Sequence, residues 1–192
     1  AATQKSLDVD AVLAELSQLQ RSSSLPGVTS PTELIDHILE RYHEVHRVQL
    51  PELIRMARRV EAVHRDHPLV PAGLADTLEA MHEELLSHMQ KEEVVLFPML
   101  KAGGNPFVGQ PIGMMRAEHV DHGASLDKLN ALTHDATPPQ GACNTWRALY
   151  AGIAQLGEDL INHIHLENNV LFPQFEAAAT TQGCGTSACS CN

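Results

Sequence analysis

The stretch HMQKEEVVLFP at residues 88–98 decides the fold, because its pattern recurs as HIHLENNVLFP at residues 163–173. Both copies place a Glu four residues after a His and end in Leu-Phe-Pro. Residues four apart lie on the same face of an α-helix. Each copy is therefore expected to present an imidazole and a carboxylate side by side, and two such faces can supply ligands to a pair of metal ions.

A weaker repeat accompanies the first one. The spacing His43-x-x-His46 recurs as His119-x-x-His122, an offset of 76 residues (43 to 119), while the stronger repeat has an offset of 75 (88 to 163). The nearly equal offsets predict that the chain consists of two matching halves. Each half is expected to be a His-rich helical hairpin.

The sequence predicts an all-α fold without strands of useful length. Ser30-Pro31-x-Glu33 has the form of a capping box with proline at the first helical position. Four long helices are expected at about residues 31–64, 72–101, 112–134 and 141–178, with a short extra N-terminal helix at 8–20. We expect a kink near Pro51 and disturbances at Pro98 and Pro173, because proline removes a helical hydrogen bond.

Steps of three and four residues between apolar or buried positions define the inward face of each long helix. Short connections between such helices favour an up-down-up-down four-helix bundle. The expected inward positions are Leu39, His43, His46, Leu50, Leu53, Ala57, Val60 and His64; Leu74, Leu78, Met81, Leu85, His88, Glu92, Val95 and Met99; Ile112, Met115, His119, His122, Leu126 and Leu129; and Leu149, Ile153, Leu156, Leu160, His163, Glu167 and Val170.

Composition limits the classes of partner. The chain has 192 residues, a formal net charge of −11 and 43% hydrophobic residues, which suits a single domain with a core. Nucleic acid and anionic membranes both need a basic surface, so we expect neither as a partner. No apolar run approaches the ~20 residues needed to span a bilayer. Twelve histidines are the conspicuous compositional excess.

The chain is expected to divide into three parts. Residues 1–30 form a short helix and a linker, residues 31–179 form the bundle, and residues 180–192 form a flexible tail. The four cysteines do not resemble a disulfide framework, because such frameworks belong to short, loop-rich chains. Three of them, Cys184, Cys189 and Cys191, crowd the Gly/Ser/Thr-rich tail. The sequence leaves the role of these three cysteines open.

Polar residues interrupt the inward faces of all four helices at comparable depth. His43 and His88 are 45 residues apart, and His119 and His163 are 44 apart, so each pair straddles one hairpin at a similar level. Leaving such groups unpaired in a Leu/Val core would cost roughly 1–3 kcal/mol each, and more for a charge. Metal coordination removes that cost. The predicted ligands are His43, His88, Glu92, His119, His163 and Glu167.

Imidazole and carboxylate ligands without thiolate suit iron, manganese or zinc. Two of the six predicted ligands are carboxylates, which can bridge two ions as in other dinuclear bundles. Four imidazoles and two bridging carboxylates would give each ion two nitrogens and two oxygens. An oxo or hydroxo bridge would bring each ion to five ligands and leave room for a small molecule.

Other polar residues near the predicted ligands have supporting roles or none. His46 and His122 are expected to support the ligands or line the cavity. Glu84 and Glu118 could orient ligands or relay protons, although a solvated helix face explains them equally well. Glu93 is expected to point outward, beside the inward-facing Glu92.

The segments HILERYHEVH, LPELI, HEELLSHMQKEEVVLFPML, MRAEH and HIHLENNVLFPQF resemble the repair-of-iron-centres family, hemerythrin-like di-iron proteins of bacteria. The resemblance covers about residues 8–175, and its metal ligands fall on the six residues predicted above. It implies two iron ions, a cytoplasmic location, and restoration of iron–sulfur clusters damaged by nitric oxide or oxidants. Family members usually carry an N-terminal domain with a paired-cysteine motif, and no such motif precedes Asp8.

Three functional hypotheses follow from this resemblance. The first is a stress-response protein that donates iron to damaged clusters or binds nitric oxide, with iron–sulfur proteins or a scaffold as iron acceptors. The second is a reversible carrier or sensor of oxygen or nitric oxide. The third is an enzyme that reduces nitric oxide, which would need a partner reductase because no nucleotide-binding motif is present. A structural bundle without metal is the weakest alternative, and the sequence does not fix the oligomeric state.

Overall fold

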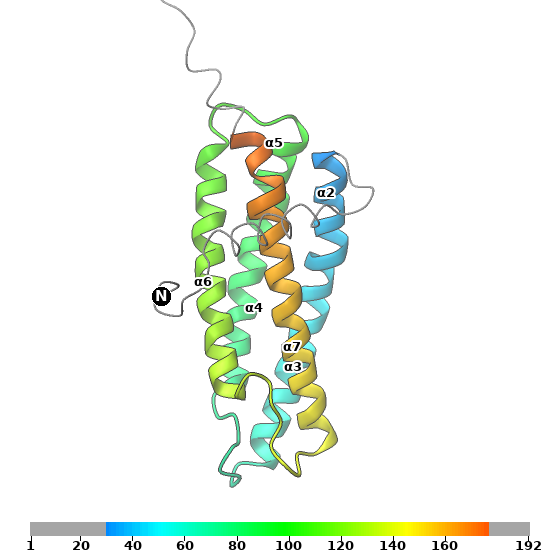
Figure 1. Cartoon of the computed structure of the whole chain (residues 1–192), viewed down its shortest axis with the longest axis vertical. Helices are drawn as coiled ribbons and strands as arrows, with labels where there is room; N and C mark the ends of the chain where they lie inside the picture. Colours follow the sequence, from blue (N-terminus) through cyan, green and yellow to red (C-terminus); the bar gives the residue numbers. More distant parts are fainter. Residues whose placement is uncertain (1–29, 177–192) are drawn as a thin grey trace, which may run out of the picture.

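The computed structural model describes residues 30–176, all of them in helices or in the turns between helices. The expected helix at 8–20 and the cysteine-containing tail lie outside these residues. Four helical rods run alternately up and down along one long axis (Figure 1). In chain order the elements are α2 (Pro31–Ile38), η2 (Leu39–His43), α3 (Glu44–Val63), α4 (Leu74–Lys91), η3 (Glu92–Leu96), α5 (Phe97–Lys101), α6 (Gly109–Thr133), α7 (Asn144–His165) and η4 (Leu166–Leu171).

The predicted capping box opens the first rod. The Ser30 side chain accepts a hydrogen bond from the backbone N–H of Glu33, and the Glu33 side chain accepts one from the backbone N–H of Ser30. These two bonds satisfy donors that have no partner at a helix start. Pro31 occupies the first turn, where its missing N–H costs nothing.

Three of the four rods contain a wide π-helical turn, in which the backbone bond spans five residues instead of four. In η3 and η4 the closing bonds run from Phe97 to Glu92 and from Phe172 to Glu167. A proline follows each turn, and the wide turn avoids the clash that a proline ring makes with the carbonyl four residues back. The predicted disturbances therefore lie just before Pro98 and Pro173. In the first rod the irregular turn is η2, and α3 continues through Pro51.

Each wide turn adds one residue and so rotates the inward face beyond it. Val95 was expected inside but is 52% exposed, whereas Leu96 and Leu100 are buried. Met99 is only partly buried against the core, and the fully buried row runs through Leu96 and Leu100 instead. In the same way Leu171 and Ile38 are fully buried, while the expected Val170 and Leu39 are partly buried against the same cluster. In α6, which has no wide turn, all six expected inward positions are buried.

The apolar core consists of two clusters, one toward each end of the bundle. Along the first rod, Tyr42 belongs to one cluster and Leu50 to the other. Along α6, Met115 and Leu126 divide in the same way. The predicted metal ligands fall between the clusters on every rod, at one level of the bundle, as the equal spacings across the hairpins predicted.

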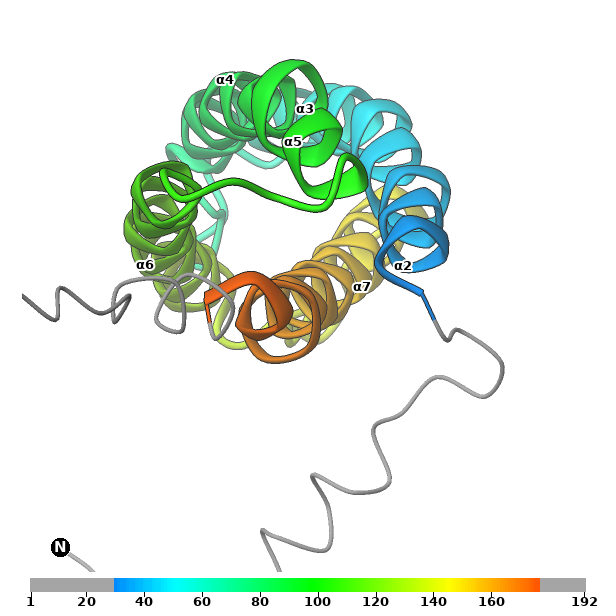
Figure 2. The same ribbon diagram turned by 90° about the horizontal axis from the view of Figure 1, so that it is seen from above.

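Seen along its axis, the bundle places the rods around a common centre (Figure 2). The α3 rod packs against α4 and α7, and α4 packs against α6. This arrangement confirms the predicted all-α, up-down-up-down, hemerythrin-like bundle. Within residues 30–176, no helix combines the length and the apolar character needed to cross a lipid bilayer.

Candidate metal centre

The structure brings the six predicted residues together in the middle of the bundle. All six are at most 4% exposed. Their positions come from every rod, and three of the six lie in or at the end of a wide turn. In chain order they are His43 in η2, His88 in α4, Glu92 in η3, His119 in α6, His163 in α7 and Glu167 in η4.

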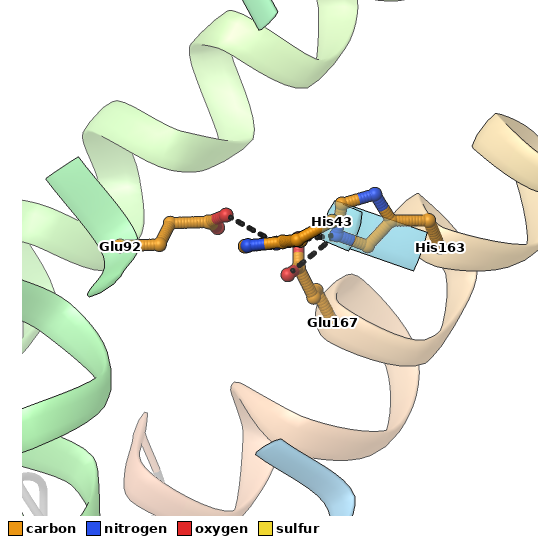
Figure 3. Close-up of side chains that lie close together, drawn as sticks. All are labelled: His43, Glu92, His163 and Glu167. Carbon is orange, nitrogen blue, oxygen red and sulfur yellow. Dashed lines mark hydrogen bonds and ion pairs between the residues drawn. The ribbon is translucent and has the colours of Figure 1, made fainter. Parts of the chain in front are cut away.

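One half of the centre combines two imidazoles with two carboxylates. The Nε2 atoms of His43 and His163 face each other at 3.2 Å. The nearest oxygens of Glu92 and Glu167 lie 3.4 Å from His43 Nε2 and 3.0 Å from His163 Nε2. Figure 3 shows these four side chains pointing toward one another, with His163 and Glu167 on the same rod. One ligand atom from each residue lies within 4.8 Å of the others, which is close enough to surround one ion.

The other half repeats the arrangement with the second pair of imidazoles. The Nε2 atoms of His88 and His119 also lie 3.2 Å apart. Here the nearest carboxylate oxygens are Glu92 Oε1, 3.5 Å from His88, and Glu167 Oε2, 3.0 Å from His119. The same two glutamates therefore belong to both groups, and each directs one oxygen to each group. This is the arrangement of carboxylates that bridge two ions.

Several buried polar atoms of the centre have no hydrogen-bond partner. Both carboxylate oxygens of Glu92 are buried and accept no hydrogen bond. Burying such groups without partners is costly, roughly 1–3 kcal/mol for each. Glu167 Oε2 also has no partner, and the four imidazole nitrogens make their hydrogen bonds only within this cluster. Four imidazole nitrogens and four carboxylate oxygens that converge in this way match the ligand preferences of divalent transition metals. The residues present therefore fit a dinuclear metal centre.

Burial keeps the imidazoles of His43 and His88 neutral. It lowers the pKa of His43 to about 4, helped by the neighbouring His163 and opposed by Glu93. Burial also lowers the pKa of His88 to about 4, although nearby carboxylates raise it. A neutral imidazole offers a lone pair, and a protonated one does not. Both side chains are therefore ready to bind a cation at neutral pH.

The two carboxylates differ although they occupy equivalent positions in the repeat. Burial and the neighbouring Glu167 raise the pKa of Glu92 well above its usual range. Burial alone would also raise the pKa of Glu167, but contacts with His163 and His119 lower it well below the usual range. Two adjacent buried carboxylates do not both ionise readily. Without metal, the proton therefore stays on Glu92 and the charge on Glu167.

The outward Nδ1 atoms of three imidazoles donate hydrogen bonds to side chains at the edge of the centre. His88 donates to Glu118 at 2.8 Å, and Glu118 also pairs with Lys91. This contact gives Glu118 the predicted position for orienting a ligand. His43 donates to Glu93 at 2.7 Å. The expectation that Glu93 points away from the centre is therefore wrong, because the wide turn that begins at Glu92 carries Glu93 toward His43.

Sequence reasoning also missed Asn168, whose Oδ1 lies 3.0 Å from His119 Nδ1. The repeat itself held the signal for this pair. Asn168 follows Glu167 as Glu93 follows Glu92, and His119 corresponds to His43. The contact between His43 and Glu93 therefore predicts the equivalent contact between His119 and Asn168.

His46 and His122 are buried beside the centre but belong to neither ligand group. Their rings lie 5.6 Å from His163 and 4.8 Å from His88, respectively, between ring centroids. No ring nitrogen of either residue has a hydrogen-bond partner, and burial lowers both pKa values to about 3. Both rings border the ligand groups without joining them, and a supporting or cavity-lining role for each stays a prediction.

A surface pocket of about 620 Å³ reaches His122 and Glu118. Glu84 also lines this pocket, but it is exposed and makes no hydrogen bond or ion pair with a candidate ligand among residues 30–176. No contact among these residues therefore supports the predicted orienting role of Glu84. Cys143 lies apart from both ligand groups, with its Sγ 3.2 Å from His64 Nε2.

Residues 34–175 match the hemerythrin HHE cation-binding domain. The chain therefore belongs to the hemerythrin family of cation-binding helical bundles, as the fold and the buried His/Glu groups indicate.

Known relatives narrow the family further. The chain is similar to proteins named iron-sulfur cluster repair protein YtfE. It is 50% identical to the one from Dickeya chrysanthemi, 51% identical to the one from Citrobacter koseri, and 52% identical to the one from Yersinia pseudotuberculosis. Each comparison covers 91% of this chain and 80% of the relative. These findings confirm the predicted membership of the repair-of-iron-centres family.

Proposed function

We propose that this protein is a di-iron protein that restores damaged iron–sulfur clusters in the cytoplasm by donating iron. The relatives named as iron–sulfur cluster repair proteins support this function. The observation that carries the proposal is the pair of buried ligand groups that share Glu92 and Glu167. A site built from two shared carboxylates can hold two ions close together.

In this proposal His43 and His163 would hold the first ion and His88 and His119 the second, and Glu92 and Glu167 would be shared by both. When bound, the iron pair supplies ferrous ions as cargo and positions for a small ligand such as nitric oxide. Imidazole and carboxylate ligands suit this task, because they hold iron less permanently than a set of thiolates would.

The protein's own residues favour reversible loading. The low pKa values of His43 and His88 keep both rings neutral at neutral pH, with the proton on Nδ1 and Nε2 free, so that loading removes no proton from either residue. Glu92 is the exception, because its raised pKa retains a proton in the empty site. That proton competes with metal for the carboxylate. The competition weakens the hold of Glu92 and favours release.

Metal content and iron transfer test the proposal directly. The purified protein should bind two ferrous ions under anaerobic conditions, and mixing it with an apo iron–sulfur protein should form a cluster faster than free ferrous iron at the same concentration. A Glu92→Ala, Glu167→Ala double variant serves as the control and should transfer nothing. Cluster formation no faster than with free iron would refute iron donation.

Gas binding separates the alternatives. A reversible carrier would change its optical spectrum with oxygen or nitric oxide and return to the starting spectrum after degassing, with both ions retained. A nitric oxide reductase would produce nitrous oxide from the reduced protein. Either result without iron transfer would replace the donor function. His122 favours neither alternative, because it lies outside the ligand groups and adds no fifth imidazole.

A further inference from the structure

The repeat that relates the two halves is regular for the inward nitrogens of the four candidate ligands and irregular for the outward ones. All four imidazoles turn Nε2 toward the carboxylates. Their Nδ1 atoms meet different partners at equivalent positions. This irregularity affects the two ligand groups unequally.

The first pair of equivalent imidazoles is His43 and His119. His43 donates from Nδ1 to Glu93 Oε1, and Arg47 donates to the same oxygen at 2.7 Å. At the equivalent position His119 donates to the neutral amide oxygen of Asn168. A charged acceptor is therefore replaced by a neutral one.

The second pair of equivalent imidazoles is His88 and His163. His88 donates from Nδ1 to Glu118. His163 Nδ1 is buried and has no hydrogen-bond partner. Tyr42 takes the position that corresponds to Glu118, at an offset of 76 residues (42 to 118), and stacks on His163 with a centroid distance of 5.3 Å and an interplanar angle of 4°. A stacked ring offers no acceptor to Nδ1.

The outward partner matters to the strength of a metal ligand. A neutral imidazole that binds metal through Nε2 carries its proton on Nδ1, and an acceptor there fixes the ring and raises its basicity. Loss of such a partner typically lowers metal affinity by about 10–100-fold. The group of His88 and His119 has two acceptors. The group of His43 and His163 has one.

We infer that the His43–His163 group releases its ion before the His88–His119 group, and that Glu93 and Asn168 are positioning residues that set the two rates. The inference rests on the proposed function, in which both groups hold ferrous iron. It goes further by naming the ion that is delivered first and the residues that control delivery.

Chelation kinetics test this order. The protein loaded with two ferrous ions is mixed anaerobically with an excess of a coloured ferrous chelator. We expect two phases of equal amplitude, each corresponding to one ion. Asn168→Ala removes the acceptor of His119 and should speed the slow phase about tenfold or more, so that the phases merge. Asn168→Asp supplies a carboxylate like that of Glu93 and should slow the same phase, which general structural damage would not do.

Asn169→Ala is the matched control for the Asn168 variants, and Glu44→Gln is the matched control for Glu93→Gln. Asn169 is the exposed neighbour of Asn168 and contacts His165 instead of the centre. Asn169→Ala should therefore leave both phases unchanged. Glu93→Gln should speed the fast phase alone. Glu44→Gln removes the other carboxylate that pairs with Arg47 and should have no effect.

The possible failures are distinguishable. A protein that binds two ions and loses both in one phase would overturn the inference while leaving the proposed function in place. An Asn168→Ala variant with a faster fast phase, or a Glu93→Gln variant with a faster slow phase, would also overturn it. A protein that does not bind two ferrous ions would instead overturn the proposed function.

Discussion

Glu92 and Glu167 occupy equivalent positions in the repeat, yet they meet different surroundings. Glu167 Oε1 accepts a hydrogen bond from His163 Nε2 at 3.0 Å, while neither oxygen of Glu92 accepts one. The structure therefore stabilises a negative charge on one carboxylate and disfavours it on the other. The two residues should respond differently to the same substitution.

We expect Glu92→Gln and Glu167→Gln to reduce metal binding below two ions, because an amide bridges poorly. Their effects on the metal-free protein should differ at pH 7. Glu167→Gln loses a charge-assisted contact and should lower the free energy of unfolding by about 1–3 kcal/mol. Glu92→Gln should leave it unchanged or raise it, because burial already keeps Glu92 protonated. Urea unfolding measures both effects, and equal losses in the two metal-free variants would contradict the assignment.

Buried neutral imidazoles also predict how the metal-free protein responds to acid. The pKa values of His43 and His88 fall from 6.5 to about 4 on folding, so between these pH values the unfolded chain binds protons that the folded protein excludes. The contribution of these two imidazoles to the free energy of unfolding should therefore be constant above pH 6.5 and be lost as the pH drops toward 4. Glu92, with its raised pKa, opposes this trend.

His46 extends the acid-sensitive range, since its pKa falls to about 3. Its ring nitrogens have no partner, so His46→Leu removes a buried polar group without breaking a hydrogen bond. This variant should show a weaker dependence on pH between 6.5 and 4, measured by urea unfolding at several pH values. An unchanged dependence would show that His46 is protonated in the folded state.

The sequence predicted the meeting of six side chains because spacing, repetition and burial cost all pointed to the same residues. It failed for the outward partners, since a helix with regular spacing turns Glu93 away from the centre. The contact of Glu93 with His43 depends on a widened turn that periodicity does not reveal. Prediction was therefore strongest for residues that repeat and weakest for those that depend on local backbone geometry.

At the scale of elements, the wide turns explain where periodicity succeeds and fails. In regular α6 every expected inward residue is buried. In the rod of α4, η3 and α5, the expectation holds up to Glu92, is wrong at Val95 and is met only partly at Met99. The two Leu-Phe-Pro motifs gave a hint, because a proline ring conflicts with the carbonyl four residues before it. They did not reveal that the turn would begin at the ligand itself.

Single-residue deletions test this account. Removing Val95 from η3 would leave Leu96 and Leu100 three and seven positions after Glu92, which is the inward spacing of a regular helix. The fold should survive with a loss of about 3 kcal/mol, since Pro98 would then stand in a regular turn. Pro98→Ala added to this deletion should recover much of the loss.

The matched control deletes Val120, an exposed residue of α6. Because α6 is regular, this deletion turns the rest of the helix by about 100° and moves His122 and Leu126 off the inward face. The variant should lose its cooperative thermal transition, followed by circular dichroism. Comparable damage from both deletions would contradict the proposed role of η3 as the site of an extra residue.

At the scale of the whole molecule, the two ligand groups connect segments that are distant in the sequence. Each group takes residues from both halves of the chain: His43 and Glu92 from the first half join His163 and Glu167 from the second. Metal binding should therefore stabilise the bundle as a unit. Burial of the six candidate ligands between the two apolar clusters becomes favourable only when their charges and lone pairs are satisfied.

We expect ferrous iron to raise the melting temperature of the protein, and a chelator to lower it. A ligand present at about 1,000 times its dissociation constant adds about 4 kcal/mol to the free energy of unfolding. Anaerobic calorimetry with increasing iron measures this shift. The Glu92→Ala, Glu167→Ala double variant should show none, and an equal shift in that variant would mean that iron binds elsewhere.

In the proposed dinuclear state each ion would take ligands from both hairpins and would crosslink the two halves of the chain. A molecule that delivered its iron would lose these crosslinks at the same time. It would keep uncompensated polar groups between its two apolar clusters. The capping box, the two apolar clusters and the hydrogen bonds of Glu93, Glu118 and Asn168 must then keep the emptied bundle folded until it is refilled. Under the proposed function, the number of delivery cycles that one molecule completes would be limited by how long its empty form survives.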